Sequence, residues 1–101
     1  MEEFLDSLSD SDAQKVAWVM RLVERLERVP QTYLKKLTGT SDLWEVRVQA
    51  SGKSYRLLGF FDGPAFLVLT TGFSKKQQKV PLREIELAQE RRKDYLRRKH
   101  K

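Results

Sequence analysis

The apolar residues of this 101-residue chain change their spacing at the polar segment 38–42. Before it, apolar residues recur at helical spacing at Ala13, Val16, Ala17, Met20, Val23 and Leu26. After it, Trp44, Val46 and Val48 alternate with polar residues. A period near 3.6 places apolar residues on one stripe of a helix, whereas a period of two places them on one face of a strand. The sequence therefore predicts an α+β fold with helices first and a sheet second.

Helices are expected on both sides of Ser9. Segment 3–8 predicts a turn of helix, and a longer helix is predicted from Ser9 to about Arg28. Ser9 can cap the first turn, the aspartates that follow it favour the positive end of the helix dipole, and Pro30 ends the pattern. Segment 32–37 is predicted to be a further short helical piece, which the loop at 38–42 ends.

Three strands are predicted over 44–49, 54–61 and 65–73, with turns at 51–53 and 62–64. Such short connections imply an antiparallel meander. Pro81 suits the first position of a closing helix. The expected inner side of that helix carries Leu82, Ile85, Ala88, Arg92 and Leu96 or Tyr95. The basic tail, 97–101, is expected to fray. The 40% apolar content suits one modest core, so residues 1–101 are interpreted as a single domain.

The positive charge is concentrated in the second half of the chain. Residues 1–42 carry 8 acids and 6 bases, whereas residues 43–101 carry 6 acids and 14 bases. This asymmetry is typical of nucleic-acid binding, although a solvated basic surface has the same composition. The chain has no cysteine, which excludes disulfides and thiolate zinc sites, and no metal or other cofactor is expected. With no long apolar run and an acidic N-terminus, the protein is expected to be cytoplasmic, without a membrane partner.

Single cations interrupt the apolar strand segments. Arg47 and Arg56 lie on neighbouring predicted strands, and Lys75 and Lys76 follow the third. A cation on a packed sheet is costly to bury, so several near one another indicate an anionic ligand, and phosphate is the obvious one. We expect these four side chains to converge on one sheet face, opposite the face that packs on the long helix.

Each cation also has a plainer interpretation. Arg47 could pair with Glu45 or Glu84, and Arg56 with a structural acid such as Asp62 or Glu86. Lys75 and Lys76 could be ordinary exposed lysines. Tyr55 and Phe73, which could stack on bases, are typical core aromatics.

A longer set of residues carries a resemblance to a known family. The set comprises Lys35-Lys36-Leu37, Leu43-Trp44-Glu45-Val46-Arg47, Tyr55-Arg56, Phe60-Phe61, Gly72-Phe73-Ser74-Lys75-Lys76, Pro81, Glu84-Ile85, Ala88 and Asp94-Tyr95. In order and spacing, over about residues 4–96, it resembles the phage-derived, HigB-like branch of the RelE/ParE toxin superfamily. The resemblance implies helices packed on a twisted antiparallel sheet and a type II toxin that cleaves messenger RNA on the ribosome, with a helix-turn-helix antitoxin as partner.

Metal-free RNA cleavage requires alignment of the 2′-OH with its own 3′-phosphate, proton transfer and stabilisation of a phosphorane. The predicted catalytic residues are Arg56, Lys75 and Lys76, and the predicted RNA contacts are Arg47, Lys53, Tyr55, Phe73 and Lys79. The sequence does not select the general acid and base. Asp94, Glu90 and a lysine of lowered pKa are candidates, whereas His100, in the basic tail, is not expected to take part.

Two other functions stay open. ParE-like members of the superfamily poison DNA gyrase, and a non-catalytic, phage-derived nucleic-acid-binding module is a third interpretation. Members of the family usually begin with a strand ahead of the segment that starts at Phe4, and this chain starts almost inside that segment. The expected consequence is an open sheet edge, and hence a homodimer through that edge or dependence on the antitoxin.

Overall fold

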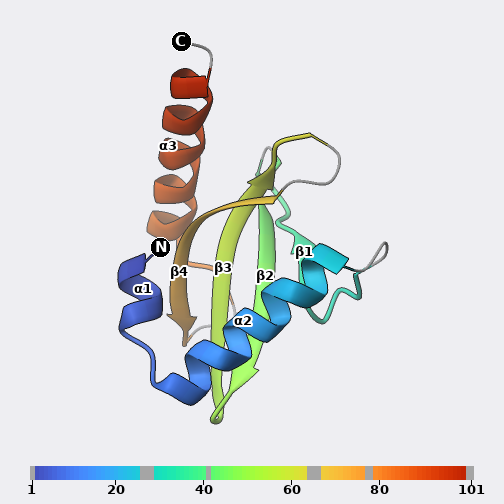
Figure 1. The fold of residues 1–101 in the computed structure, drawn as a ribbon. Coiled ribbons are helices and arrows are strands. Elements are labelled where there is room, and N and C mark those ends of the chain that lie inside the picture. The colour runs from blue at the N-terminus through green and yellow to red at the C-terminus, as the bar shows by residue number, and fades with distance from the viewer. Residues whose placement is uncertain (1, 26–28, 41, 64–66, 77–78, 100–101) are drawn as a thin grey trace.

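The computed structural model describes residues 2–25, 29–40, 42–63, 67–76 and 79–99 (Figure 1). Its elements, in chain order, are α1 (Glu2–Asp6), α2 (Asp10–Arg25), β1 (Leu34–Lys36), β2 (Trp44–Ala50), β3 (Lys53–Phe61), β4 (Leu67–Lys75) and α3 (Leu82–Lys99). The strands form one antiparallel sheet in the order β1-β2-β3-β4. The predicted α+β class is therefore confirmed. The predictions that residues 26–28 are helical and residues 65–66 extended lie outside the described residues.

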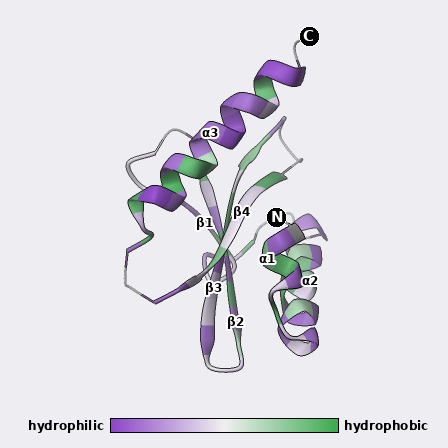
Figure 2. Cartoon of the chain, turned by 90° about the vertical axis from the view of Figure 1, so that its left-hand side faces the viewer, coloured by the Kyte–Doolittle hydropathy of each residue, from purple (hydrophilic) through white to green (hydrophobic). Residues whose placement is uncertain are grey.

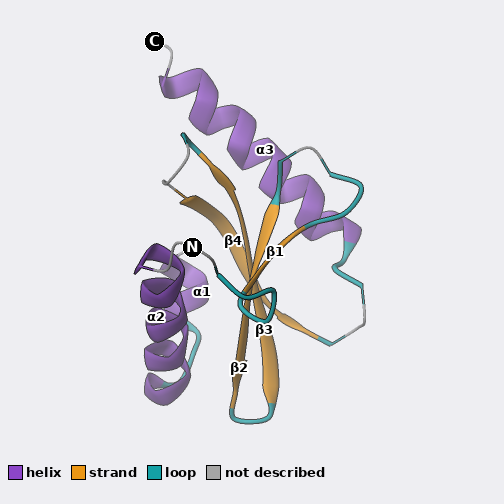
Figure 3. Cartoon of the chain, turned by 90° about the vertical axis from the view of Figure 1, so that its right-hand side faces the viewer, coloured by secondary structure: helices purple, strands orange, loops and turns teal. Residues whose placement is uncertain are grey.

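Helices cover both faces of the sheet. Figures 2 and 3 show α1 and α2 on one side of the strands and α3 on the other. On the α2 side, Val16 and Val19 pack with Val46 and Leu57. On the α3 side, a second apolar cluster forms around Leu43, Leu58, Phe60 and Ala88. Because α3 crosses only part of its face, the rest of that face is left for polar side chains (Figure 2).

The start of α2 is tied to the turn between β2 and β3. Ser9 Oγ accepts a hydrogen bond from the Asp12 backbone N–H at 3.2 Å, as a capping serine does. The buried Asp12 carboxylate accepts hydrogen bonds from Tyr55 Oη at 2.6 Å and Ser51 Oγ at 2.7 Å. These bonds, the Tyr55 bond first, lower the pKa of Asp12, and the same Tyr55 bond raises the pKa of Tyr55. The network fixes α2 across the sheet, and it occupies the Tyr55 hydroxyl group.

The helical piece predicted at 32–37 is wrong. Residues 31–33 form a turn, and Leu34–Lys36 is an edge strand antiparallel to β2, with Leu34 opposite Val46. The backbone N–H of Leu37 donates to Leu43 O at 2.9 Å, which closes the hairpin around segment 38–42. Pairing with β2 gives hydrogen-bond partners to backbone N–H and C=O groups that a short helical turn leaves unpaired. Tertiary hydrogen bonding therefore makes this segment a strand.

A β-bulge shapes the β3–β4 pair. Leu58 lies opposite Thr71 and Gly59 opposite Leu69, so Thr70 is the extra residue on β4. Thr70 Oγ1 donates to Leu58 O at 2.9 Å, and Arg91 of α3 donates to Thr70 O. A Cβ on Gly59 would lie 2.5 Å from Val68 O, so this position requires glycine. β4 extends to Lys75, two residues beyond the predicted end, and Lys75 therefore lies inside a strand.

Two expectations for the closing helix are wrong. Leu82 is 68% exposed, so the inner side of α3 begins at Ile85 and Ala88. The tail remains helical through Lys99, because Tyr95 Oη and Lys99 Nζ bind Asp62 at 2.8 and 2.5 Å. Among the described residues, no helix is both long enough and apolar enough to cross a membrane.

Candidate phosphate-binding site

The strand register places three of the predicted cations on one face. Arg47 lies directly opposite Arg56 in the β2–β3 pair, and directly opposed residues share a face. Phe73 lies opposite Arg56 in the β3–β4 pair, and Lys75, two residues further along β4, shares its face. This is the α3 side of the sheet. The prediction that Arg47, Arg56 and Lys75 lie on the face opposite α2 is confirmed.

Arg47 and Lys75 line a groove of about 490 Å³ on this face, which we call the basic groove. Its charged lining consists of Lys35, Lys36, Glu45, Arg47, Lys75 and Lys79. The lining also includes Val80 and Ile85, which come from the start of α3 and the segment before it. Cations from β1, β2, β4 and the β4–α3 connection therefore meet in one concave site, although they are far apart in sequence. A concave, predominantly positive surface of this kind attracts phosphate.

Glu45 lies at the centre of these cations and is only 4% exposed. Its Oε1 is 2.9 Å from Arg47 Nε and 3.4 Å from Arg56 Nε. The plainer interpretation of Arg47 as a partner of Glu45 is therefore confirmed, and Glu45 is also the acidic partner of Arg56. Glu45 is a site residue that was not predicted from the sequence. The signal was present, because residues 45 and 47 of one strand share a face.

Arg56 lies beneath the basic groove rather than in its lining. It is 6% exposed, and its Nη1 donates to the backbone oxygen of Tyr55 at 3.0 Å. Arg47 is more accessible, with 31% of its side chain exposed, and its Nη1 contacts Gln31 O at 3.5 Å. Arg56 thus supports Glu45 from below, while Arg47 reaches the open groove. A direct contact of Arg56 with phosphate stays a prediction.

Burial and neighbouring charges perturb two of these cations. Burial lowers the pKa of Lys75, and the positive charge of Arg56 lowers it further, while Glu45 acts in the opposite direction. Burial also lowers the pKa of Arg56, against the raising effect of Glu45. A lysine whose neutral form is favoured can accept a proton. Among the described lysines, Lys75 is the one whose pKa is lowered, so it is the residue that corresponds to the lysine candidate for the general base.

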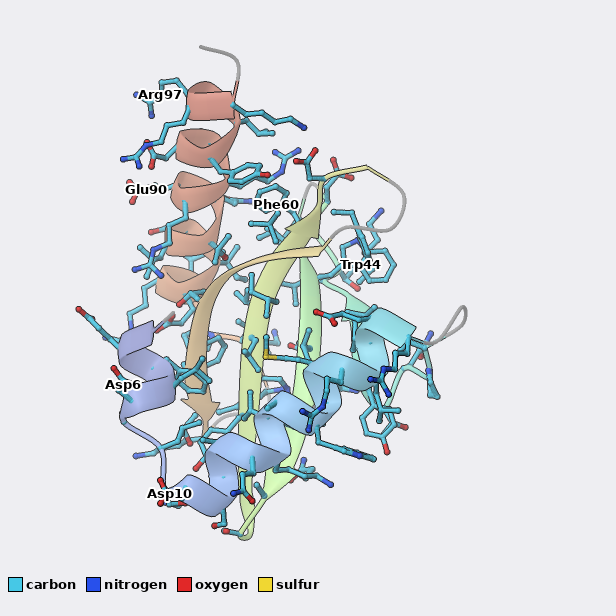
Figure 4. The ribbon with its side chains drawn as sticks, viewed as in Figure 1. Asp6, Asp10, Trp44, Phe60, Glu90 and Arg97 are labelled. Carbon is cyan, nitrogen blue, oxygen red and sulfur yellow. The ribbon has the colours of Figure 1, made fainter. Side chains whose placement is uncertain are left out.

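The other predicted site residues are not gathered in this groove, except for Lys79. Lys53, Tyr55 and Lys76 line a second groove on the α2 side of the sheet. Phe73 packs partly buried against the core under α3. Figure 4 shows Phe60 between the sheet and α3, whereas Glu90 points away from both. Asp94 forms an exposed pair with Arg98 at 3.2 Å, and His100 lies outside the described residues.

In the part of the chain that the structure describes, no three histidine or acidic side chains gather as metal ligands. A comparison with curated proteins and with solved structures finds no match. A comparison with protein families matches residues 3–93 to the family described as phage derived protein Gp49-like (DUF891). Because this match spans most of the chain, the protein belongs to the phage-derived Gp49-like family, which is associated with toxin-antitoxin systems.

Proposed function

We propose that the protein is the toxin of a type II toxin-antitoxin pair within the RelE/ParE superfamily, and that it cleaves messenger RNA on the ribosome. The observation that carries the proposal is the basic groove. Arg47 and Lys75 converge there with Lys35 and Lys79, and Arg56 lies directly beneath. The family to which the chain belongs is compatible with a toxin.

The proposed reaction is an attack of the 2′-OH of one nucleotide on its own 3′-phosphate. A bond forms between O2′ and phosphorus, and the bond from phosphorus to the 5′-oxygen of the next nucleotide breaks. Lys75, in its neutral form, takes the 2′-OH proton, and a protonated lysine of the groove, Lys35 or Lys79, gives a proton to the leaving oxygen. Arg47 stabilises the phosphorane, because its guanidinium can offer paired N–H groups to two oxygens.

Glu45 also faces the groove and is the alternative proton acceptor. We assign the base role to Lys75 because Glu45 Oε1 is already shared between two guanidinium groups. A carboxylate that contacts two guanidinium groups orients them, and we assign this role to Glu45. Both contacts are made by Nε atoms, so the terminal nitrogen Nη2 of Arg47 is left for a phosphate oxygen.

The proposed partners are the ribosome, messenger RNA and a helix-turn-helix antitoxin. A homodimer through the outer edge of β4 is the alternative assembly. Light scattering of the toxin alone, and then with the product of any neighbouring helix-turn-helix gene, separates the two. A concentration-dependent dimer supports the edge contact, and a stable monomer that forms a complex with the antitoxin argues against it.

The reaction is tested with purified protein and ribosomes that carry a defined messenger RNA. We expect cleavage that leaves a 2′,3′-cyclic phosphate and a 5′-hydroxyl, because the attacking oxygen belongs to the substrate. The double variant Arg47→Ala with Lys75→Ala serves as the inactive control. An absence of cleavage, or 5′-phosphate ends, contradicts the proposed reaction. Inhibition of gyrase supercoiling by the same preparation then supports the ParE-like alternative.

A further inference from the structure

A second groove opens on the α2 side of the sheet, at the end where the β2–β3 turn and the last residues of β4 lie. Its volume is about 560 Å³, within the range of roughly 300–1,000 Å³ that is usual for ligand sites. The charged side chains that line it are all cations: Lys53, Lys75 and Lys76. Ser74 adds a hydroxyl, whereas the hydroxyls of Ser7 and Ser54, which also line the groove, already donate to Phe4 O and Gln49 Oε1. Ammonium and hydroxyl donors together suit the oxygens of a phosphate.

The floor of the second groove is aromatic. Phe4 and Tyr55 line it, with ring centroids 6.0 Å apart and planes at 70° to one another. Tyr55 is only 4% exposed and its hydroxyl is occupied by Asp12, so the half-buried ring of Phe4 is the one that a ligand can reach. Both oxygens of Asp12 are in turn engaged, by Tyr55 and Ser51. An aromatic floor beneath cations is the combination that holds a nucleotide, with its base against a ring and its phosphate near a lysine.

Lys75 lines both grooves and therefore connects them. It is the last residue of β4, at one end of the described sheet, and its register partner on β3 is Ser54. A single strand that has its phosphate near Lys75 in the basic groove can therefore continue around the end of β4. Among anionic polymers, RNA fits better than an acidic peptide, because the second groove offers the accessible ring of Phe4 as well as cations.

We infer that the second groove binds the part of a single-stranded RNA that flanks the phosphate in the basic groove, and that Lys53 and Lys76 contact its backbone. This inference rests on the proposed function for the identity of the ligand. Its test measures binding without ribosomes and without cleavage. A failure of cleavage and a failure of this second site are therefore separate results.

The test compares Lys53→Ala with Lys76→Ala, as a double variant, against the unmodified protein. Both lysines are exposed, so the fold is expected to persist, and circular dichroism checks this. For a long oligouridylate, the slope of log K against log salt should become about 1.4 less steep, since each lost phosphate contact on a single strand contributes about 0.7. For a uridine dinucleotide, which fills the basic groove alone, the slope should not change.

The matched control is Arg21→Ala with Arg25→Ala, which also removes two exposed cations, but from α2. We expect this control to leave the slope for the long RNA intact. If both double variants reduce the slope equally, or neither does, the second site is refuted, because general charge then explains the binding.

Amide chemical shifts locate the contact. The long oligouridylate should shift the amides of Ser54, Ser74 and Lys76, and the dinucleotide should not. Polyglutamate serves as the acidic-peptide probe. Shifts at these amides with polyglutamate but not with RNA overturn the inference, because they assign the groove to an acidic protein segment.

Discussion

One buried acid organises the cations of the basic groove. Glu45 is 4% exposed and contacts the Nε atoms of both Arg47 and Arg56 through a single oxygen. Two guanidinium groups so close to one another repel, and the carboxylate between them offsets that repulsion. Because Glu45 also opposes the lowering of the pKa of Lys75, it acts on the orientation of the arginines and on the protonation of the lysine together.

Replacement of Glu45 by Gln should separate these effects. The loss of a negative charge should strengthen RNA binding at low salt. It should also lower the pKa of Lys75 further, so that the midpoint of the rate-against-pH profile moves to lower pH. Single-turnover cleavage over a pH series, with binding measured in parallel, checks both. If Glu45 is itself the general base, the variant should instead lose activity at every pH, by roughly 10²–10⁴-fold.

The proton acceptor role of Lys75 predicts a specific pH dependence. Since its pKa is lowered by burial and by Arg56, cleavage should rise with pH and level off below the ordinary range for a lysine. Lys75→Arg keeps the charge but cannot lose a proton, so this variant should bind RNA and show no such rise. A parallel rise in the variant and in the unmodified protein contradicts the assignment.

The sequence was sufficient to place Arg47, Arg56 and Lys75 on one face, because strand alternation and short turns fix the register. The sequence did not show that Arg56 lies under the basic groove, because the burial of its side chain depends on how α3 and β1 pack around it. Lys76 was misplaced for a simpler reason. β4 runs on to Lys75, so Lys76 reaches the second groove on the other side of the sheet.

Among the secondary-structure elements, β1 is the one that was predicted with the wrong type. Its three residues carry no strand pattern of their own, and only the pairing with β2 makes them extended. The β-bulge at Thr70 was not predicted from the sequence either, although a glycine within a strand, such as Gly59, often marks a bulge. In contrast, α2, β2 and β3 were predicted close to their observed bounds, because each has a long and clear hydrophobic period.

The bulge predicts a difference between two glycine substitutions. Gly59→Ala places a Cβ 2.5 Å from the backbone oxygen of Val68, which cannot move without a shift of β4. A Cβ on Gly72 would lie 2.5 Å from the ring of Phe4, a side chain of the short helix α1 that can shift without moving a strand. We expect Gly59→Ala to reduce the free energy of unfolding by roughly 1–3 kcal/mol, and Gly72→Ala by less. Urea denaturation of both variants checks this order, and equal losses contradict it.

The fold as a whole distributes its helices unequally over the two sheet faces. α1 and α2 cover one face, while α3 crosses the other obliquely (Figure 3). The cations of β2 and β4 line the basic groove beside the start of α3. The tail of α3 is held by Asp62, through Tyr95 and Lys99. The basic groove thus exists because α3 stops short of covering the sheet, which no local sequence pattern encodes.

The central claim is that the basic groove stabilises the transition state of RNA cleavage, beyond simple attraction of RNA. The most direct test is single-turnover cleavage on programmed ribosomes by Arg47→Ala, with ribosome binding measured separately. The account predicts a loss of about 30- to 1,000-fold in the saturated rate, equivalent to about 2–4 kcal/mol, with a much smaller change in binding. Arg97→Ala with Arg98→Ala, at the far end of α3, should weaken binding in a salt-dependent way and leave the saturated rate intact. An unchanged saturated rate for Arg47→Ala, with a loss confined to binding, would contradict the account.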